Sequence, residues 1–312
     1  MRFCGNEICC GSYACLNAMK NEKVDLQLFE ISTSVPFGIR HMGNQKFDRI
    51  LTTYFDPNKG MDAALELWGY GTEKYASHTS KKIIGILKKY LKKYPAVVGP
   101  VNMGRLFYQT MPHLLERMDH YIMLEYWSEN KVLCTDSEGF YRYCMSYGEL
   151  ETYLSAENVV EACGVICVRF IYIQKSFLMK DIIETSYRNA FRNLCEAEKR
   201  NEGSRAVLRC YEFLSQHDLN KWRLPFLFDI QYLQQRKYLM QLLLEKCREI
   251  GIGEREIQKK SVEIVERQQA LLGKMYYKLK YDMCIKKENF QELAELEYRI
   301  QKTGDGFVYS AH

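Results

Sequence analysis

The chain has 312 residues, which is enough for two modest domains or one large domain. Hydrophobic residues make up 47% of the sequence and aromatic residues 13%, so a substantial core can be buried and an intrinsically disordered chain is excluded. The net charge of +5, from 44 basic and 39 acidic residues, is too small to indicate a nucleic-acid-binding protein, which would gather its basic residues on one face.

The cysteines and the apolar stretches indicate the cellular compartment that we expect for this protein. The chain has twelve cysteines, and they are scattered, with no pair of CxxC motifs to suggest a zinc ribbon. We therefore expect no metal and no cofactor, and interpret most thiols as small core residues. The start of the sequence lacks the hydrophobic region of a signal peptide, and no stretch reaches the roughly 18 apolar residues of a membrane helix. We expect a reduced, cytoplasmic protein that does not contact a membrane.

In chain order, the first predicted element is a helix over residues 10–20, where small and apolar residues recur on one face. Residues 21–60 are predicted to be irregular because prolines and glycines interrupt them. Two further helices are predicted over 62–67 and 79–93, the second capped by Thr79 or Ser80. In this second helix lysine pairs alternate with isoleucine and leucine, which is typical of an amphipathic helix with a solvated basic face.

The pattern then changes to strands. Four segments are rich in β-branched and aromatic residues and are separated by turn signals: 96–99, 121–126, 131–135 and 164–173. Helices followed by a compact antiparallel sheet describe an α+β domain, which we place at residues 1–174.

The remainder, residues 175–312, is predicted to be an all-helical domain of four or five helices. It is rich in Leu, Glu, Lys, Gln and Arg, and its expected breaks are Gly203, Pro225 and residues 251–253. Its aromatic residues could close over a cleft, although their helical spacing is typical of core positions. The segment from Gly304 to His312 is expected to be a frayed tail.

A candidate nucleophile stands at the start of the first helix. A cysteine in the first helical turn faces unpaired backbone N–H groups and the positive end of the helix dipole. Both favour the thiolate, and the same N–H groups can stabilise an oxyanion. Cys9 and Cys10 both occupy this region, while Cys15 lies deeper on the apolar face and is expected to be inert. The alternative is that all three are ordinary buried thiols.

A candidate base and its orienting acid lie on two consecutive strands. His120 stands where a loop enters an apolar strand, and Asp136 closes the next strand. The two strands should pair as a hairpin, which would bring the carboxylate beside the imidazole to hold its tautomer. Separately, a histidine and a turn-starting aspartate are commonly structural. Together with the helix-start thiol, they predict a Cys–His–Asp arrangement for nucleophilic catalysis. His41, His78 and His113 lack a strand context and should lie elsewhere.

The segments Pro95–Leu106, Asp119–Tyr121 and Val132–Phe140 resemble the butirosin-biosynthesis protein H family. That family joins a domain related to the bacteriocin-leader cysteine peptidases, which are papain-like, to a helical C-terminal domain. Its first motif is a cysteine with small or apolar residues at +4, +5, +8 and +9. Counted from Cys10 these are Ala14, Cys15, Ala18 and Met19, which fits better than counting from Cys9.

The resemblance covers residues 1–174 well and the second domain weakly. It implies a papain-like cysteine acyltransferase that moves an acyl or aminoacyl group from a carrier-protein thioester, or an amide, to an amine in secondary-metabolite or peptide biosynthesis. Cys10, His120 and Asp136 would be its catalytic residues. Asn102 and Met103 would line the substrate cleft, although the family usually has an acid where Asn102 stands and a proline where Ser137 stands.

Other assignments stay open. The leader peptidases complete their oxyanion hole with a glutamine that this chain lacks, and Asn6 is the nearest amide that could replace it. Cys9 is the alternative nucleophile. The alternative functions are a cysteine peptidase or amide hydrolase and a catalytically dead binding protein. An acyl carrier protein or a peptide is the expected partner, nucleic acid is not, and the sequence does not fix the oligomeric state.

Overall fold

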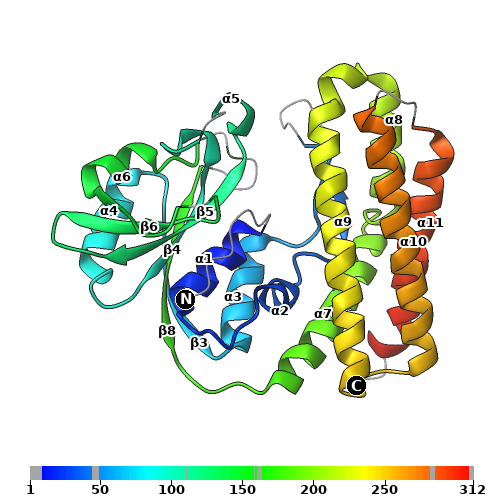
Figure 1. The fold of residues 1–312 in the computed structure, drawn as a ribbon, viewed down its shortest axis with the longest axis horizontal. Coiled ribbons are helices and arrows are strands. Elements are labelled where there is room, and N and C mark those ends of the chain that lie inside the picture. The colour runs from blue at the N-terminus through cyan, green and yellow to red at the C-terminus, as the bar shows by residue number, and fades with distance from the viewer. Residues whose placement is uncertain are drawn as a thin grey trace. The chain divides into compact units, whose positions relative to one another are not determined.

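The structure is a computed structural model that describes residues 9–43, 49–109, 112–138, 140–157, 159, 164–281 and 285–308. The chain divides into two compact units: Met1–Phe29 with Met61–Phe177, and Glu30–Gly60 with Leu178–His312. The first is a mixed α+β region built on an antiparallel sheet, and the C-terminal region of the second is all helical (Figure 1). The predicted division at residue 174 differs from this one in assigning Glu30–Gly60 to the first domain.

The first unit is organised around a six-stranded sheet in the order β3-β8-β4-β5-β6-β7, and every neighbouring pair is antiparallel. Its strands are β3 (Tyr70–Ser77), β4 (Ala96–Asn102), β5 (Asp119–Tyr126), β6 (Lys131–Thr135), β7 (Tyr143–Ser146) and β8 (Ile166–Ile173). The predicted hairpin is present, because Met123 of β5 pairs with Thr135 of β6. Only antiparallel pairing allows such a short connection between neighbouring strands.

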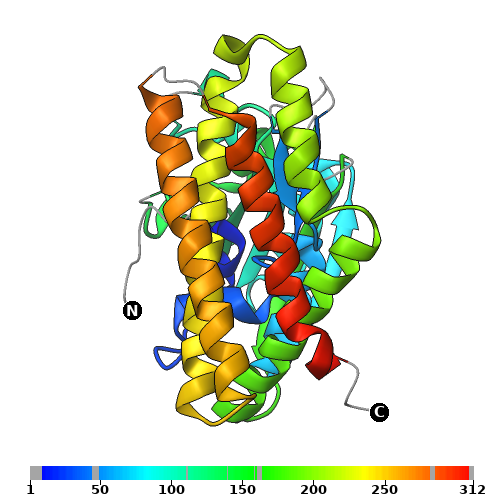
Figure 2. The ribbon, with the colours of Figure 1, turned by 90° about the vertical axis from the view of Figure 1, so that its right-hand side faces the viewer.

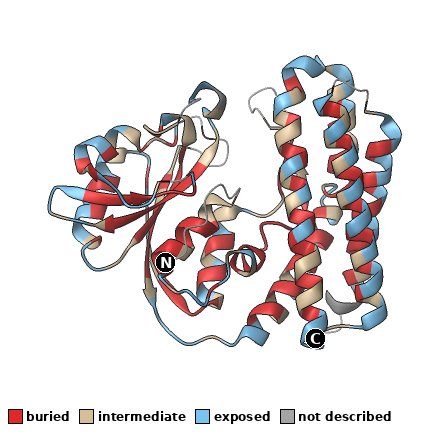
Figure 3. Ribbon diagram, viewed as in Figure 1, coloured by how far each residue is buried: buried red, intermediate tan, exposed pale blue. Residues whose placement is uncertain are grey.

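Helices cover both faces of this sheet. Helix α1 (Cys10–Met19) packs against β5, β4 and β8. The other face carries a hydrophobic core shared with α4 (Ser80–Tyr90) and α6 (Tyr147–Tyr153), to which Ile122 and Leu124 of β5 contribute. Side chains alternate along a strand, so the intervening Tyr121 and Met123 face α1. Figure 3 shows the central strands as largely buried.

The strand next to β5 contains an irregularity beside the candidate site. The register of β4 against β5 shifts between Val98 and Val101. A Cβ atom added to Gly99 would lie 2.4 Å from Tyr121 Cδ1 and 2.6 Å from the His120 carbonyl oxygen. Residue 99 must therefore be glycine for the Tyr121 ring and the backbone of His120 to come this close.

The second unit is built from long helices. They are α7 (Met179–Lys199), α8 (Ser204–Gln216), α9 (Leu219–Glu249), α10 (Arg255–Lys280) and α11 (Lys287–Val308). Figure 2 shows α9, α10 and α11 lying lengthwise beside one another. A small antiparallel pair, β1 (Ile39–His41) and β2 (Leu51–Thr53), packs on α8. The Asp229 carboxylate of α9 holds β2, because it accepts N–H bonds from Ile50 and Leu51 at 2.9 Å and from Arg49 Nε at 2.5 Å.

Several element predictions need correction. Residues 21–60 are not wholly irregular, because they contain α2 (Leu26–Ser32), β1, β2 and the start of α3 (Pro57–Leu67). Pro225 lies within the first turns of α9 and does not end a helix. Helix α11 continues through Gly304 to Val308, and residues 309–312 lie outside the described part of the chain. None of the helices in the described ranges is long and apolar enough to cross a membrane.

Candidate functional site

Helix α1 begins at Cys10, and Cys9 is its N-cap residue with a non-helical backbone. The Cys9 carbonyl accepts the first intrahelical bond, from the Tyr13 N–H at 3.0 Å. Both thiols are half-buried, whereas Cys15 is fully buried at 0% exposure. Cys10 therefore stands in the first turn, where backbone N–H groups face an incoming anion, and Cys15 has no access to solvent. Asn6, the predicted oxyanion residue, lies outside the described residues.

The start of α1 lies against the middle strand of the sheet. A Cβ added to Gly11 would lie 3.5 Å from Tyr121 Cδ2 and 2.7 Å from Met61 Sδ. The first turn of α1 thus touches the residue that follows His120. The absence of a side chain at Gly11 leaves room for the Met61 side chain of α3, which a Cβ atom would have to displace.

His120 and Asp136 form a buried pair. His120 is the second residue of β5, and Asp136 directly follows β6. The imidazole Nε2 lies 2.8 Å from Oδ1 and 2.9 Å from Oδ2 of Asp136. The carboxylate also accepts the Glu138 backbone N–H at 2.9 Å and the Ser137 hydroxyl at 3.4 Å. His120 is 2% exposed and Asp136 is 0% exposed, so the pair is withdrawn from water.

Burial disfavours charge on both partners. It lowers the pKa of the His120 imidazole and raises the pKa of the Asp136 carboxyl, against the hydrogen bond from the Glu138 backbone. Attraction between opposite charges would act against both shifts, so the two groups titrate as one pair. The bond to the acid assigns the N–H of the neutral ring to Nε2. Nδ1 then keeps its lone pair and is the nitrogen that can serve as a base.

The position of His120 on its strand restricts how a thiol can approach it. Alternation places its side chain on the face of Ile122 and Leu124, whereas Tyr121 points toward α1. His120 is only one residue from the end of β5, however, and Cys10 is the first residue of α1. A thiol of α1 would therefore have to approach the imidazole past the end of the strand.

The predicted cleft residues have structural contacts. Asn102 is 1% exposed, and its Oδ1 accepts the N–H groups of Gly104 at 3.0 Å and Arg117 at 3.2 Å. It thereby fixes both ends of the connection between β4 and β5. The neighbouring Met103 is half-buried, and its N–H donates to the Met118 carbonyl at 3.0 Å. An amide oxygen at residue 102 can accept these donors as a carboxylate would.

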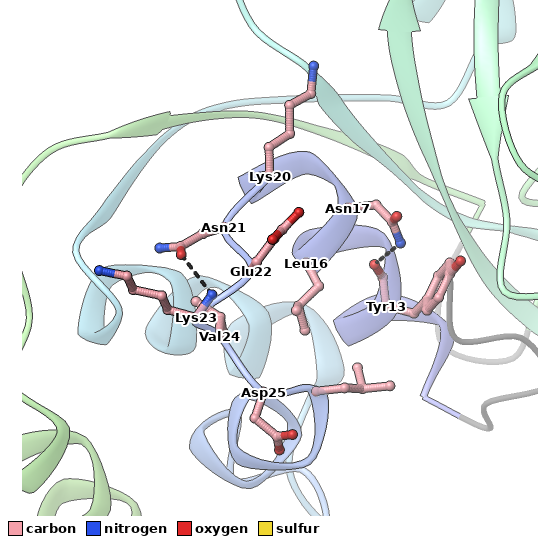
Figure 4. Close-up of a pocket in the computed structure, with 10 residues that line it drawn as sticks. Tyr13, Leu16, Asn17, Lys20, Asn21, Glu22, Lys23, Val24 and Asp25 are labelled. Atoms are coloured by element: carbon pink, nitrogen blue, oxygen red, sulfur yellow. Dashed lines mark hydrogen bonds between the residues drawn. The ribbon is translucent and has the colours of Figure 1, made fainter. Parts of the chain in front are cut away.

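A cavity of about 610 Å³ lies along α1 (Figure 4). One wall is a single stripe of the helix, with Tyr13, Leu16, Asn17 and Lys20, and residues 21–26 complete the lining. Asn17 Nδ2 donates to the Tyr13 carbonyl at 2.9 Å, so its amide is bonded although buried. Cys10 precedes Tyr13 by three residues and Asn17 by seven, which places the thiol at the N-terminal end of the same stripe.

Sequence reasoning did not identify this cavity. Tyr13 and Asn17 are not among the predicted site residues, but both are buried and both line the cavity. The sequence signal for this wall is the spacing of residues 13, 16, 17 and 20, which places them on one face of a helix.

The remaining histidines lie away from His120. His41 ends β1 in the second unit, His78 follows β3 and contacts the Gly164 carbonyl, and His113 is exposed in α5 (Pro112–Leu115). Among the described residues, no group of three His, Cys, Asp or Glu side chains is placed to hold a metal ion.

Comparison with known proteins adds little to this geometry. No protein-family model matches the sequence. The chain is 27% identical over 147 residues to the "Uncharacterized protein YobF" of Bacillus subtilis (strain 168), and this match covers 46% of each chain. The chain thus matches less than half the length of that relative, and the similarity assigns no family.

Proposed function

We propose that this protein is a cysteine-dependent acyltransferase in which Cys10 carries the acyl group and the His120–Asp136 pair moves the protons. The buried pair carries the proposal, because a histidine whose Nε2 is held by a carboxylate presents Nδ1 as a base of defined orientation. Helix α1 also packs on β5, the strand that carries His120. The domain would be papain-like, as its helix packed on an antiparallel sheet suggests.

The proposed reaction has two steps. His120 Nδ1 takes the proton of Cys10, the thiolate attacks the carbonyl carbon of a thioester or amide, and the imidazolium returns the proton to the leaving thiol or amine. An acceptor amine then attacks the Cys10 acyl-enzyme and gives its proton to Nδ1. The proton passes to the departing Cys10 sulfur, so the enzyme is regenerated. Backbone N–H groups in the first turn of α1 would stabilise each oxyanion.

The cavity along α1 would take the acyl chain. Its inner wall includes buried Tyr13 and Val24, and its rim carries the exposed side chains of Lys20, Lys23 and Asp25. A volume of about 610 Å³ is within the usual range of small-molecule sites. Such a wall suits an extended chain with its carbonyl carbon at Cys10 and a polar far end. The donor would be a carrier-protein or peptide thioester or amide.

Mass spectrometry tests the reaction class. The protein is incubated with acyl thioesters of N-acetylcysteamine, with and without a primary amine, and intact mass and products are recorded. We expect one acyl adduct per chain, an amide product when the amine is present, and no adduct in His120→Ala. Release of only free acid in the presence of amine would instead favour a hydrolase. An unmodified protein with every donor would favour the catalytically dead binding protein.

A further inference from the structure

The helical unit contains a second, much smaller cavity, of about 10 Å³. Its lining includes Phe37 and Gly38 from the segment before β1. Helix α9 contributes Arg236, Lys237 and Met240, and helix α10 contributes Gln268. A volume of this size holds about one water-sized particle. Every one of these residues belongs to the second unit.

The polar groups at this cavity are deeply buried and carry hydrogen-bond donors without acceptors. Arg236 is 3% exposed, and none of its three guanidinium nitrogens has a hydrogen-bond partner in the structure. Gln268 is 0% exposed, and neither atom of its amide is bonded. The guanidinium carbon lies 3.9 Å above the centre of the Tyr232 ring, which provides a cation–π contact with a neutral phenol but no counter-charge.

The nearby acidic side chains are engaged elsewhere. Glu297 forms an ion pair with Lys237, the second cation at the cavity. Asp229 accepts bonds from Arg49 and from the backbone of β2. Glu30 acts on Tyr232 through its charge, and within the described residues it forms no ion pair with Arg236. Of the two cations at this cavity, Arg236 is therefore the one that forms no ion pair within the described part of the chain, and a buried charge without a counter-charge is strongly unfavourable.

We propose that this cavity binds one small monovalent anion, of the size and charge of chloride. Such an ion would accept N–H bonds from Arg236 and from the Gln268 amide and would neutralise the guanidinium. Water could accept the same bonds but would leave the charge uncompensated. Phosphate, sulfate and carboxylates are too large for a space that holds one water-sized particle. This site is independent of the acyl-transfer proposal.

Binding of the anion to the folded state alone would make stability depend on its concentration. Thermal unfolding of the full chain is followed by circular dichroism in sodium chloride and in sodium gluconate at equal ionic strength. We expect the melting temperature to rise by several degrees with chloride and then to reach a plateau. Equal melting temperatures in the two salts at every concentration would overturn the proposal.

Three variants separate a bound ion from a general salt effect. Arg236→Met should remove the chloride response. Gln268→Glu places a carboxylate beside the guanidinium, so it should melt in gluconate at least as high as the wild type saturated with chloride, and show no further response. Gln258→Glu, at another buried glutamine of α10, is the control: it should lower the melting temperature and keep the response. A chloride response retained in Arg236→Met or in Gln268→Glu would overturn the proposal.

Discussion

At the scale of single residues, the candidate site depends on which proton donors surround the Asp136 carboxylate. Its Oδ1 accepts the Glu138 backbone N–H, while both oxygens lie within 2.9 Å of His120 Nε2. The acid therefore has two tasks, to fix its own loop and to hold the imidazole. A substitution that satisfies the loop alone would leave the ring with the wrong tautomer.

Asp136→Asn tests this role directly. The amide oxygen would stay with Glu138 N–H, and the amide NH₂ would then donate to His120 Nε2, which moves the ring proton to Nδ1. We expect acyl-enzyme formation to fall by about 10²–10⁴-fold, measured by stopped incubation and intact mass. Glu138→Gln keeps the backbone donor and should stay within about threefold of the wild-type rate. A wild-type rate in Asp136→Asn would remove the acid from the mechanism.

His41 in the second unit predicts an acid-sensitive stability. Burial, and then the charge of Arg209, lower the pKa of His41 to about 4. The pKa of His41 is lower in the folded state than its unfolded value of 6.5, so the folded protein favours the neutral imidazole. The unfolding free energy is therefore at its full value above pH 6.5 and decreases as the pH falls toward 4. With allowance for partial exposure, the loss between pH 7 and pH 5 is about 1 kcal/mol.

The measurement is urea unfolding at several pH values. His41→Gln should flatten the fall in unfolding free energy between pH 7 and pH 5, because the variant has no imidazole to protonate. His78→Gln, on the surface of the other unit, provides the control and should retain the wild-type slope. The same slope in all three proteins would show that other groups govern the acid response.

At the scale of elements, the sequence predicted the interior of the sheet better than its borders. The strands near residues 96, 121, 131 and 166 are buried and apolar, and all four were predicted. The two strands of the six-stranded sheet that were not predicted, β3 and β7, are its two edges. An edge strand is solvated along one side, so its buried residues alternate with too many polar ones to produce a clear pattern.

The candidate site follows the same division. The His120–Asp136 contact was predictable because both residues mark the ends of strands that form a short hairpin. The cavity along α1 was not, since it depends on how residues 21–26 fold back on the helix. Ser146 and Glu149 form a capping box that starts α6, and the Ser-x-x-Glu spacing is a local sequence signal for this helix start.

Substitution of Gly99 tests how closely β4 and β5 must pack, and substitution of Gly85 in α4 is the control. In Gly99→Ala the new Cβ meets the Tyr121 ring and the His120 carbonyl, so the strands must separate. We expect a loss of about 1–3 kcal/mol in unfolding free energy, together with slower acylation because His120 moves. Gly85→Ala lies inside α4 with no atom within 4 Å, and should gain about 0.5–1 kcal/mol. Urea unfolding gives both values, and equal effects would contradict this packing.

At the scale of the whole molecule, the chain folds into two units with separate cores. Each unit is assembled from two segments that are not adjacent in the sequence. The segment Glu30–Gly60 groups with the helices rather than with the sheet that precedes and follows it in sequence. Its attachment is specific, because Asp229 of α9 accepts bonds from Arg49, Ile50 and Leu51. Asn193 of α7 likewise donates to the Ser34 carbonyl at 3.0 Å. Polar contacts of this kind link distant residues, and no periodicity in the sequence reports them.

Asp229→Ala should therefore affect the helical unit alone. It leaves the Arg49 Nε–H and the backbone N–H groups of Ile50 and Leu51 without their acceptor, which costs about 3–5 kcal/mol. Hydrogen exchange read by mass spectrometry should show lost protection in residues 49–53 and in α9, with the strands β4, β5 and β8 unchanged. Asp218→Ala removes only the N-cap bond of the same helix, and should cost about 1 kcal/mol. Lost protection in those strands would contradict separate cores.

The central claim is that Cys10, at the start of α1, is the nucleophile of the molecule. The most direct measurement is peptide mapping of the acyl-enzyme formed by wild type, Cys10→Ala and Cys9→Ala with the same thioester. We predict that the acyl group maps to Cys10 in the wild type and in Cys9→Ala, and that Cys10→Ala forms no adduct. An adduct on Cys9 that persists in Cys10→Ala, or no adduct in any of the three proteins, would contradict the claim.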